Sequence, residues 1–136
     1  MNNDGKYLET EAEDFFKDTK LMNFYWRRLH DAKSARNKFP AQPADFFYSS
    51  LIYGGCHLEC KSVGGPKPRL KKFSQWAAMR RWAHAGIHGY LLVHFYLLGR
   101  YYIVDVMDLE AAPSWLLDGE YYVGGEDALC SLLKIY

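Results

Sequence analysis

The segment 87–108, IHGYLLVHFYLLGRYYIVDVMD, constrains the fold more than any other part of the chain. It contains apolar runs of strand length on both sides of Gly99, and continuous apolar runs of this kind are typical of strands that are buried on both faces. Glycine accommodates the backbone conformations that a tight turn requires. We therefore predict a buried hairpin that turns near Gly99 and lies at the centre of a covered sheet.

The remaining elements follow from apolar spacing and from turn residues. Helical spacing of apolar residues predicts an amphipathic helix over about 6–19 and a second helix over 69–86 that ends at Gly86. Strands are predicted over 22–30 and over two parts of 44–63, joined near Gly54 and Gly55. Residues 126–136 are expected to close the chain as a short helix. The order is helix, three strands, helix, two strands, then a tail.

This order predicts an α/β fold with a mixed central sheet flanked by helices. At 136 residues, the chain fits a single domain that buries a sizeable core. We expect the core to span about 5–108, and the role of the tail, 109–136, is left open. The longest apolar stretches are too short to span a bilayer, so no membrane segment is expected.

Charge is segregated along the chain although the net charge is only +1. Residues 19–104 contain 14 lysines and arginines against three acids, whereas the two ends contain three bases and 13 acids. A basic region of this kind indicates a polyanionic partner such as DNA, because local potential steers association. A solvated surface without a partner is the alternative.

The chain has three cysteines, Cys56, Cys60 and Cys130, and it begins MNNDGK without a charged leader and apolar run. An odd number of cysteines without such a leader favours the reducing cytoplasm. Zinc binding by Cys56, His57 and Cys60 is disfavoured, because side chains alternate along a strand and His57 then lies opposite both thiols.

The segment HLECKS, 57–62, places Glu59 and Lys61 on the same side of a strand, two residues apart. Asp45, in the motif PAD, lies on the preceding predicted strand. Carboxylates of this kind can hold Mg²⁺ against a phosphate oxygen, and a nearby ammonium can orient water or offset developing charge. The alternative is an ordinary solvated face with an ion pair.

These motifs resemble those of restriction-endonuclease-like nucleases with the PD-(D/E)xK signature, and among them the phage-encoded and bacterial Holliday junction resolvases of the RecU type. The resemblance rests on EDFFKDT, FYWRRLHD, PAD, ECK and SQWAAM, and on the order of the elements over about residues 5–108. It implies a restriction-endonuclease-like core and an Mg²⁺-dependent endodeoxyribonuclease, with Mn²⁺ as an alternative ion. It also implies a homodimer acting on branched DNA in recombination or repair.

The resemblance assigns a role to each of these motifs. Metal ligands are expected at Glu13 in the first helix, Asp45, Glu59 and the Cys60 carbonyl, with Glu9 as the alternative to Glu13. Lys61 is the expected catalytic cation, and Gln75 is expected to hydrogen-bond water or phosphate beside the metal. Phosphate contacts are predicted for the basic residues Arg27, Arg28, Lys33, Arg36, Lys38, Lys67, Arg69, Lys71 and Lys72.

Two features depart from the family pattern. Ala44 separates Pro43 from Asp45, and the basic loop at 31–42 is shorter than the stalk of the bacterial members, which makes junction selectivity less secure than nuclease chemistry. Another nuclease of this fold and a non-catalytic DNA-binding module remain the alternatives. A simple two-residue turn at Gly54 and Gly55 would pair Asp45 with Gly64 and separate the carboxylates. The site therefore requires a wider loop, a bulge or a bend at Asp45.

Overall fold

The computed structural model describes residues 5–21, 23–29, 44–51, 54–64, 75–111 and 120–133. The order of the elements is α1 (Gly5–Asp18), β1 (Tyr25–Arg28), β2 (Phe46–Ser50), β3 (Gly54–Val63), α2 (Trp76–His84), β4 (His88–Phe95), β5 (Arg100–Asp105), α3 (Val106–Ala111), β6 (Tyr121–Tyr122) and α4 (Gly125–Leu133). No helix within these ranges is long and apolar enough to cross a bilayer.

All six strands form one sheet in chain order, β1 to β6. β3 and β4 are parallel, joined through α2, and every other neighbouring pair is antiparallel. The prediction of an α/β fold with a mixed sheet flanked by helices is confirmed at this level. The predicted β4–β5 hairpin is also confirmed, and Gly99 adopts the positive φ of 63° that its turn requires.

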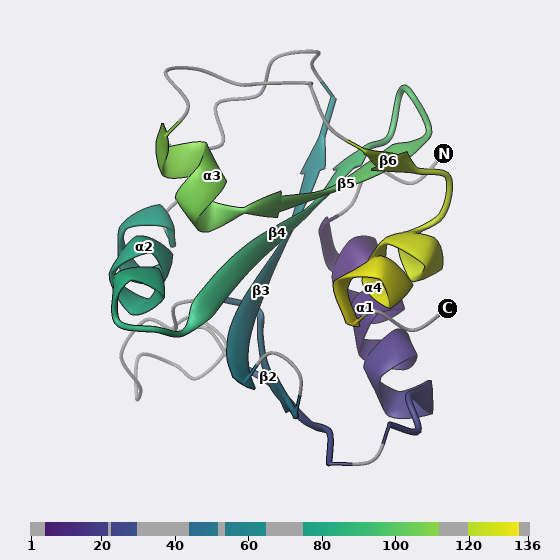
Figure 1. Cartoon of the computed structure of the whole chain (residues 1–136). Coiled ribbons are helices and arrows are strands. Elements are labelled where there is room, and N and C mark those ends of the chain that lie inside the picture. Colours follow the sequence, from purple (N-terminus) through teal and green to yellow (C-terminus); the bar gives the residue numbers. More distant parts are fainter. Residues whose placement is uncertain are drawn as a thin grey trace, which may run out of the picture.

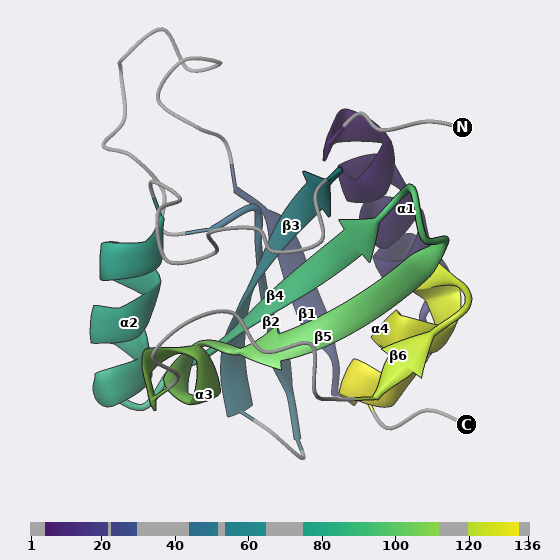
Figure 2. The same cartoon turned by 90° about the horizontal axis from the view of Figure 1, so that it is seen from above.

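The helices cover both faces of the sheet, with α1 and α4 on one side and α2 and α3 on the other (Figures 1 and 2). Leu92 belongs to the apolar core beneath α1 and α4, whereas its neighbours Leu91 and Val93 belong to the core beneath α2 and α3. All three are fully buried. β4 is therefore the covered central strand that its continuous apolar sequence predicts.

α1 presents a narrow apolar stripe to the sheet. Leu8, Ala12 and Phe16 recur every fourth residue and are at most 1% exposed. The ring of Phe16 packs between those of Trp26 and Phe46, at centroid distances of 5.7 and 5.3 Å. This packing fixes α1 against β1 and β2. It therefore also fixes the positions of the acidic residues of α1 that lie beside the apolar stripe.

The turn between β2 and β3 differs from the predicted position near Gly54 and Gly55. Ser50 pairs with Gly54 and Phe46 with Leu58, so the connection is made by residues 51–53. This register brings the end of β2 at Asp45 to Glu59 rather than to Gly64. The wider loop that the predicted site requires is therefore present.

Two elements in the C-terminal part were not predicted. α3 begins directly after β5, where the Asp105 carboxylate accepts a hydrogen bond from the Met107 backbone N–H at 2.8 Å. β6 is only two residues long and pairs with β5. The predicted final helix is present as α4, and Leu129 and Leu132 pack it onto the α1 side of the core. This part of the tail covers the sheet.

Candidate active site

Asp45 lies in a bend immediately before β2, and its carboxylate lies in the plane of the sheet. Its Oδ2 accepts a hydrogen bond from the backbone N–H of Cys60 at 2.8 Å, just beyond the last β2–β3 pair, Phe46 with Leu58. The backbone oxygen of Asp45 accepts from the N–H of Leu29 at 2.8 Å. The side chain thus replaces a strand carbonyl, which places a carboxylate where side chains from either face can reach it.

Glu59 approaches Asp45 from the α2 side of the sheet. It lies beside Leu91 in the parallel ladder, and its neighbours Leu58 and Cys60 point into the opposite core. The side chain of Glu59 is only 2% exposed, and burial together with the adjacent Asp45 carboxylate raises its pKa to about 9. The Lys61 ammonium opposes this shift from 3.6 Å.

One oxygen of Glu59 lacks a partner. Oε2 faces Lys61, while Oε1 is buried without a hydrogen-bond partner in the described part of the chain. A buried carboxylate oxygen left in this way is costly unless it is protonated or meets a cation. The site can therefore accommodate either a proton shared with Asp45 or a positively charged ligand in its place.

Glu9 reaches Asp45 from α1. Burial and then the Asp45 carboxylate raise the pKa of Glu9 to about 7, and Arg28 acts against this shift. The two carboxyl groups are close enough for a hydrogen bond when one of them is protonated. Asp45 is therefore adjacent to Glu9 on the helix and to Glu59 on β3, and three acids from separate segments converge.

Glu13, the ligand predicted on the first helix, lies one turn further along α1 and is paired with bases. Its Oε2 accepts a hydrogen bond from Arg28 Nη1 at 2.8 Å, and its Oε1 lies 3.9 Å from Lys17 Nζ. The structure thus brings the alternative, Glu9, to Asp45 and leaves Glu13 on Arg28. The helical spacing of Glu9 and Glu13 predicts that both lie on one side of α1. It does not determine which of the two lies beside Asp45.

Arg28 has a structural position that differs from its predicted contact with DNA. Its guanidinium joins Glu13 to Glu9, whose Oε1 is 3.5 Å from Nη2, and it lies 6.0 Å from the centre of the Phe46 ring. This bridge was not predicted from the sequence. An arginine at the end of β1, facing acids one helical turn apart, was the signal available.

The other predicted site residues occupy the same end of the sheet. Lys61 lies one strand position beyond Cys60 with its side chain 31% exposed, so the ammonium reaches from the buried carboxylate toward solvent. Gln75 precedes α2, the helix that returns the chain from the C-terminal end of β3 to the start of β4. Gln75 therefore lies toward the end of β3 that carries Lys61.

Arg27 is exposed on the edge strand β1. The other predicted phosphate contacts lie outside the described residues, and they are Lys33, Arg36, Lys38, Lys67, Arg69, Lys71 and Lys72. The residues that flank these two basic segments are described. Ala44 adjoins Asp45, and Gly64 follows β3, the strand that carries Glu59 and Lys61.

The cysteines form no disulfide, and two of them pack in the core. Cys56 and Cys60 face α1 and α4, whereas His57 contacts the ring of Trp82 on α2 at a centroid distance of 5.7 Å. His57 thus lies on the other side of β3 from both thiols, as alternation predicted. Burial raises the pKa of the Cys60 thiol well above its usual value, which keeps it protonated.

The donor chemistry of the acids suits a hard divalent cation. The described residues contain no group of three His, Cys, Asp or Glu side chains placed to hold a metal ion. Magnesium, however, is usually bound by one or two carboxylates together with water and substrate phosphate rather than by a complete protein cage. Asp45 and Glu59, with one buried oxygen unpartnered, fit that requirement.

Comparison of the chain with protein-family models, curated proteins and solved structures finds no match.

Proposed function

We propose that the chain is a divalent-metal-dependent endonuclease that hydrolyses phosphodiester bonds in branched DNA, with the Holliday junction as the expected substrate. The observation that carries this proposal is the approach of the buried Glu59 carboxyl group to Asp45 beside the Lys61 ammonium, with Glu9 as a further acid adjacent to Asp45. Acids that belong to an ordinary solvated face remain exposed, whereas Glu59 is only 2% exposed.

The chemistry follows from where these groups lie. Asp45 and Glu59 would hold Mg²⁺ or Mn²⁺, with the Cys60 carbonyl on the same edge and Glu9 as the nearest further carboxylate. A bound divalent ion would supply Lewis-acid stabilisation of phosphate charge. Lys61 extends from Glu59 toward solvent, where its ammonium can orient a water molecule or offset charge on the phosphate. Gln75 would hydrogen-bond to the same water or phosphate.

The arrangement of the elements supports a restriction-endonuclease-like core. A helix is followed by three antiparallel strands, a covering helix and a fourth strand parallel to the third. This is the order of elements on which the resemblance to the PD-(D/E)xK nucleases rests. Of the two acids that the resemblance assigns to the signature, Asp45 lies immediately before β2 and Glu59 lies in β3.

The position of the two basic segments supports a DNA substrate. Segments 30–43 and 65–74 together contain seven lysines and arginines and one acid, Asp31. One segment leads into Asp45, and the other begins after the strand that carries Glu59 and Lys61. Phosphate contacts from these segments would bring the DNA backbone to the acids, giving shape-based recognition that weakens strongly with salt.

The remaining parts of the proposal follow from the substrate. A homodimer would place two identical sites on the symmetry-related strands of a four-way junction and make paired nicks. The resemblance implies 5′-phosphate and 3′-hydroxyl products and a role in recombination, repair or phage DNA processing. The three free cysteines suit a reducing cytoplasm, of a bacterium or of a phage-infected cell.

The proposal is tested by incubating the purified protein with labelled four-way, flap and linear duplex DNA, with and without Mg²⁺. We expect metal-dependent cleavage, fastest on the four-way junction. Equal cleavage of all three substrates would instead indicate a repair or restriction-like nuclease. Absence of cleavage in both Mg²⁺ and Mn²⁺ would reject the enzyme and leave a DNA-binding module.

Replacement of Lys61 separates catalysis from binding. We expect Lys61→Ala to reduce cleavage about 100-fold or more while junction binding changes little, because the ammonium acts on the reacting phosphate. Lys17→Ala is the matched control, since Lys17 is an exposed lysine that pairs with Glu13 away from Asp45. Equal losses of cleavage in the two variants would contradict the role of Lys61.

A further inference from the structure

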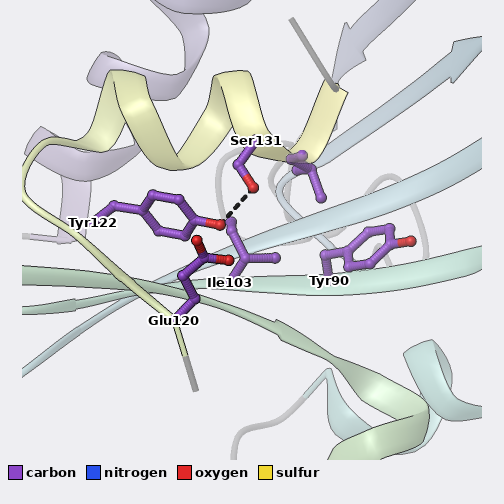
Figure 3. Close-up of a pocket in the computed structure, with 6 residues that line it drawn as sticks. Tyr90, Ile103, Glu120, Tyr122 and Ser131 are labelled. Carbon is purple, nitrogen blue, oxygen red and sulfur yellow. Dashed lines mark hydrogen bonds between the residues drawn. The ribbon is translucent and has the colours of Figure 1, made fainter. Parts of the chain in front are cut away.

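A pocket on the α4 side of the sheet, apart from the candidate active site, has a composition of its own (Figure 3). Its volume is about 260 Å³, and it is lined by Tyr90, Ile103, Glu120, Tyr122, Ser131 and Leu132. The floor comes from β4, β5 and the start of β6, and the roof comes from the last turn of α4.

The strand register explains how the polar groups meet. Tyr122 pairs with Tyr101 across β5 and β6, so Glu120, two residues earlier, lies on the same face opposite Ile103. The Tyr122 hydroxyl and Ser131 Oγ are 2.5 Å apart, and either group can donate. Figure 3 shows the Glu120 carboxylate directed toward this hydroxyl pair. One side of the pocket is therefore polar, and Ile103 and Leu132 form an apolar side.

The electrostatic character of the pocket is negative. Glu120 is the one charged residue in the lining. The last turn of α4 carries no basic residue among the described positions, and the carbonyls at a helix C-terminus give it partial negative charge. These two contributions favour a positively charged ligand.

The size of the pocket limits the ligand further. Pockets for drug-sized molecules typically enclose about 300–1,000 Å³, and this one lies just below that range. It suits one cationic head with a short alkyl chain, in which the head meets Glu120 and the two hydroxyls and the chain meets Ile103 and Leu132.

We propose that this pocket binds an alkylguanidinium or alkylammonium group. The proposal does not depend on the nuclease activity, because none of the pocket residues belongs to the acid cluster. The same chemistry is presented by a free small amine and by an arginine side chain of a peptide, and the binding experiment distinguishes these two sources.

The test is a titration of the isotope-labelled full chain followed by NMR chemical shifts, with n-butylguanidinium as the probe. We expect saturable binding with a Kd on the order of 1 mM, centred on Tyr122 and Ser131. Butyrate and 1-butanol, which have the opposite charge and no charge, should bind at least about tenfold more weakly. Tighter binding of acetyl-Gly-Arg-amide than of butylguanidinium would identify a peptide side chain as the source of the ligand. Tighter binding of butylguanidinium would identify a free small cation as the source.

Variants assign the binding to named groups. We expect Glu120→Gln to weaken butylguanidinium binding about tenfold and Tyr122→Phe, which keeps the ring but loses the hydroxyl, about threefold. Glu126→Gln is the control, because this exposed carboxylate lies at the other end of α4 and should leave the Kd unchanged. No saturable binding, equal binding of butanol, or an unchanged Kd in Glu120→Gln would each overturn the proposal.

Discussion

The two faces of β3 differ sharply although their residues alternate along one strand. Cys56, Leu58 and Cys60 point into the core beneath α1 and α4, where the neighbours are apolar or aromatic. His57 and Glu59, on the other face, are equally buried but ionisable. One face stabilises the fold by packing, whereas the other holds a carboxylate whose ionisation burial opposes.

We infer from this difference that one face of the strand serves the fold and that the other serves the proposed metal chemistry. A residue that only stabilises the fold can be replaced only at a loss of stability. A buried acid beside another acid is a source of instability, and proteins commonly retain such groups at functional sites. Substitutions on the two faces should therefore have opposite effects on stability.

The largest effect is expected on the packed face. Phe16→Ala should lower the free energy of unfolding by about 3–5 kcal/mol, because it removes a fully buried ring that packs on Trp26, Phe46 and Tyr48. Urea denaturation followed by circular dichroism measures this loss. Phe15→Ala, which removes a half-buried ring on the same helix, should cost clearly less. An equal cost for the two variants would contradict the assignment of Phe16 to the core.

A substitution on the face of β3 that carries Glu59 is expected to increase the free energy of unfolding. The pKa of Glu59 is raised to about 9 in the folded protein, from 4.5, so the contribution of Glu59 to the stability of the metal-free fold is complete below about pH 4.5 and is lost as the pH rises through 9. Glu59→Gln removes this loss. Without divalent metal, we expect the variant to match the wild type near pH 5 and to exceed it by about 1–3 kcal/mol near pH 9.

Thermal unfolding across this pH range tests the Glu59 prediction, with Asp14→Asn as a control that removes an exposed carboxylate of α1. The control should follow the wild type at every pH. The Glu59→Gln variant should also lose cleavage of the junction despite its greater stability. If it were less stable than the wild type near pH 9, Glu59 would be a structural partner of Lys61 rather than a strained acid.

A smaller effect distinguishes the two acids of α1. Glu9 adjoins Asp45, whereas Glu13 is held by Arg28 and Lys17. We expect Glu9→Gln to weaken Mn²⁺ binding about tenfold and Glu13→Gln to weaken it no more than about twofold, since Coulomb attraction falls with distance. Electron paramagnetic resonance of free Mn²⁺ measures both affinities. The reverse order would assign the third carboxylate to Glu13.

Much of the fold could be predicted from local patterns. The four-residue spacing of Leu8, Ala12 and Phe16 predicted α1, and the apolar runs around Gly99 predicted the β4–β5 hairpin. These signals arise within one element and do not depend on what the element packs against. Gly54 and Gly55 correctly predicted a hairpin between β2 and β3 but not the position of its turn, because Gly55 lies within β3 and pairs with Ser49.

The candidate site could be predicted in part. Alternation placed Glu59 and Lys61 on one face of β3, but the contact of Asp45 with the Cys60 N–H depends on the register between β2 and β3. The approach of Glu9 depends on where α1 crosses the sheet, which helical spacing does not determine. β6 was missed because two residues carry no periodicity of their own, and its pairing with β5 is a tertiary contact.

The central claim is that Asp45 and Glu59 together bind a divalent ion, and anomalous scattering from a crystal soaked in Mn²⁺ tests it most directly. We predict a peak between these two carboxylates, with Glu9 as the nearest further acid and Lys61 beside it, and loss of the peak in Glu59→Gln. A fully soaked crystal with no peak at this position, or with the same peak in the Glu59→Gln variant, would contradict the claim.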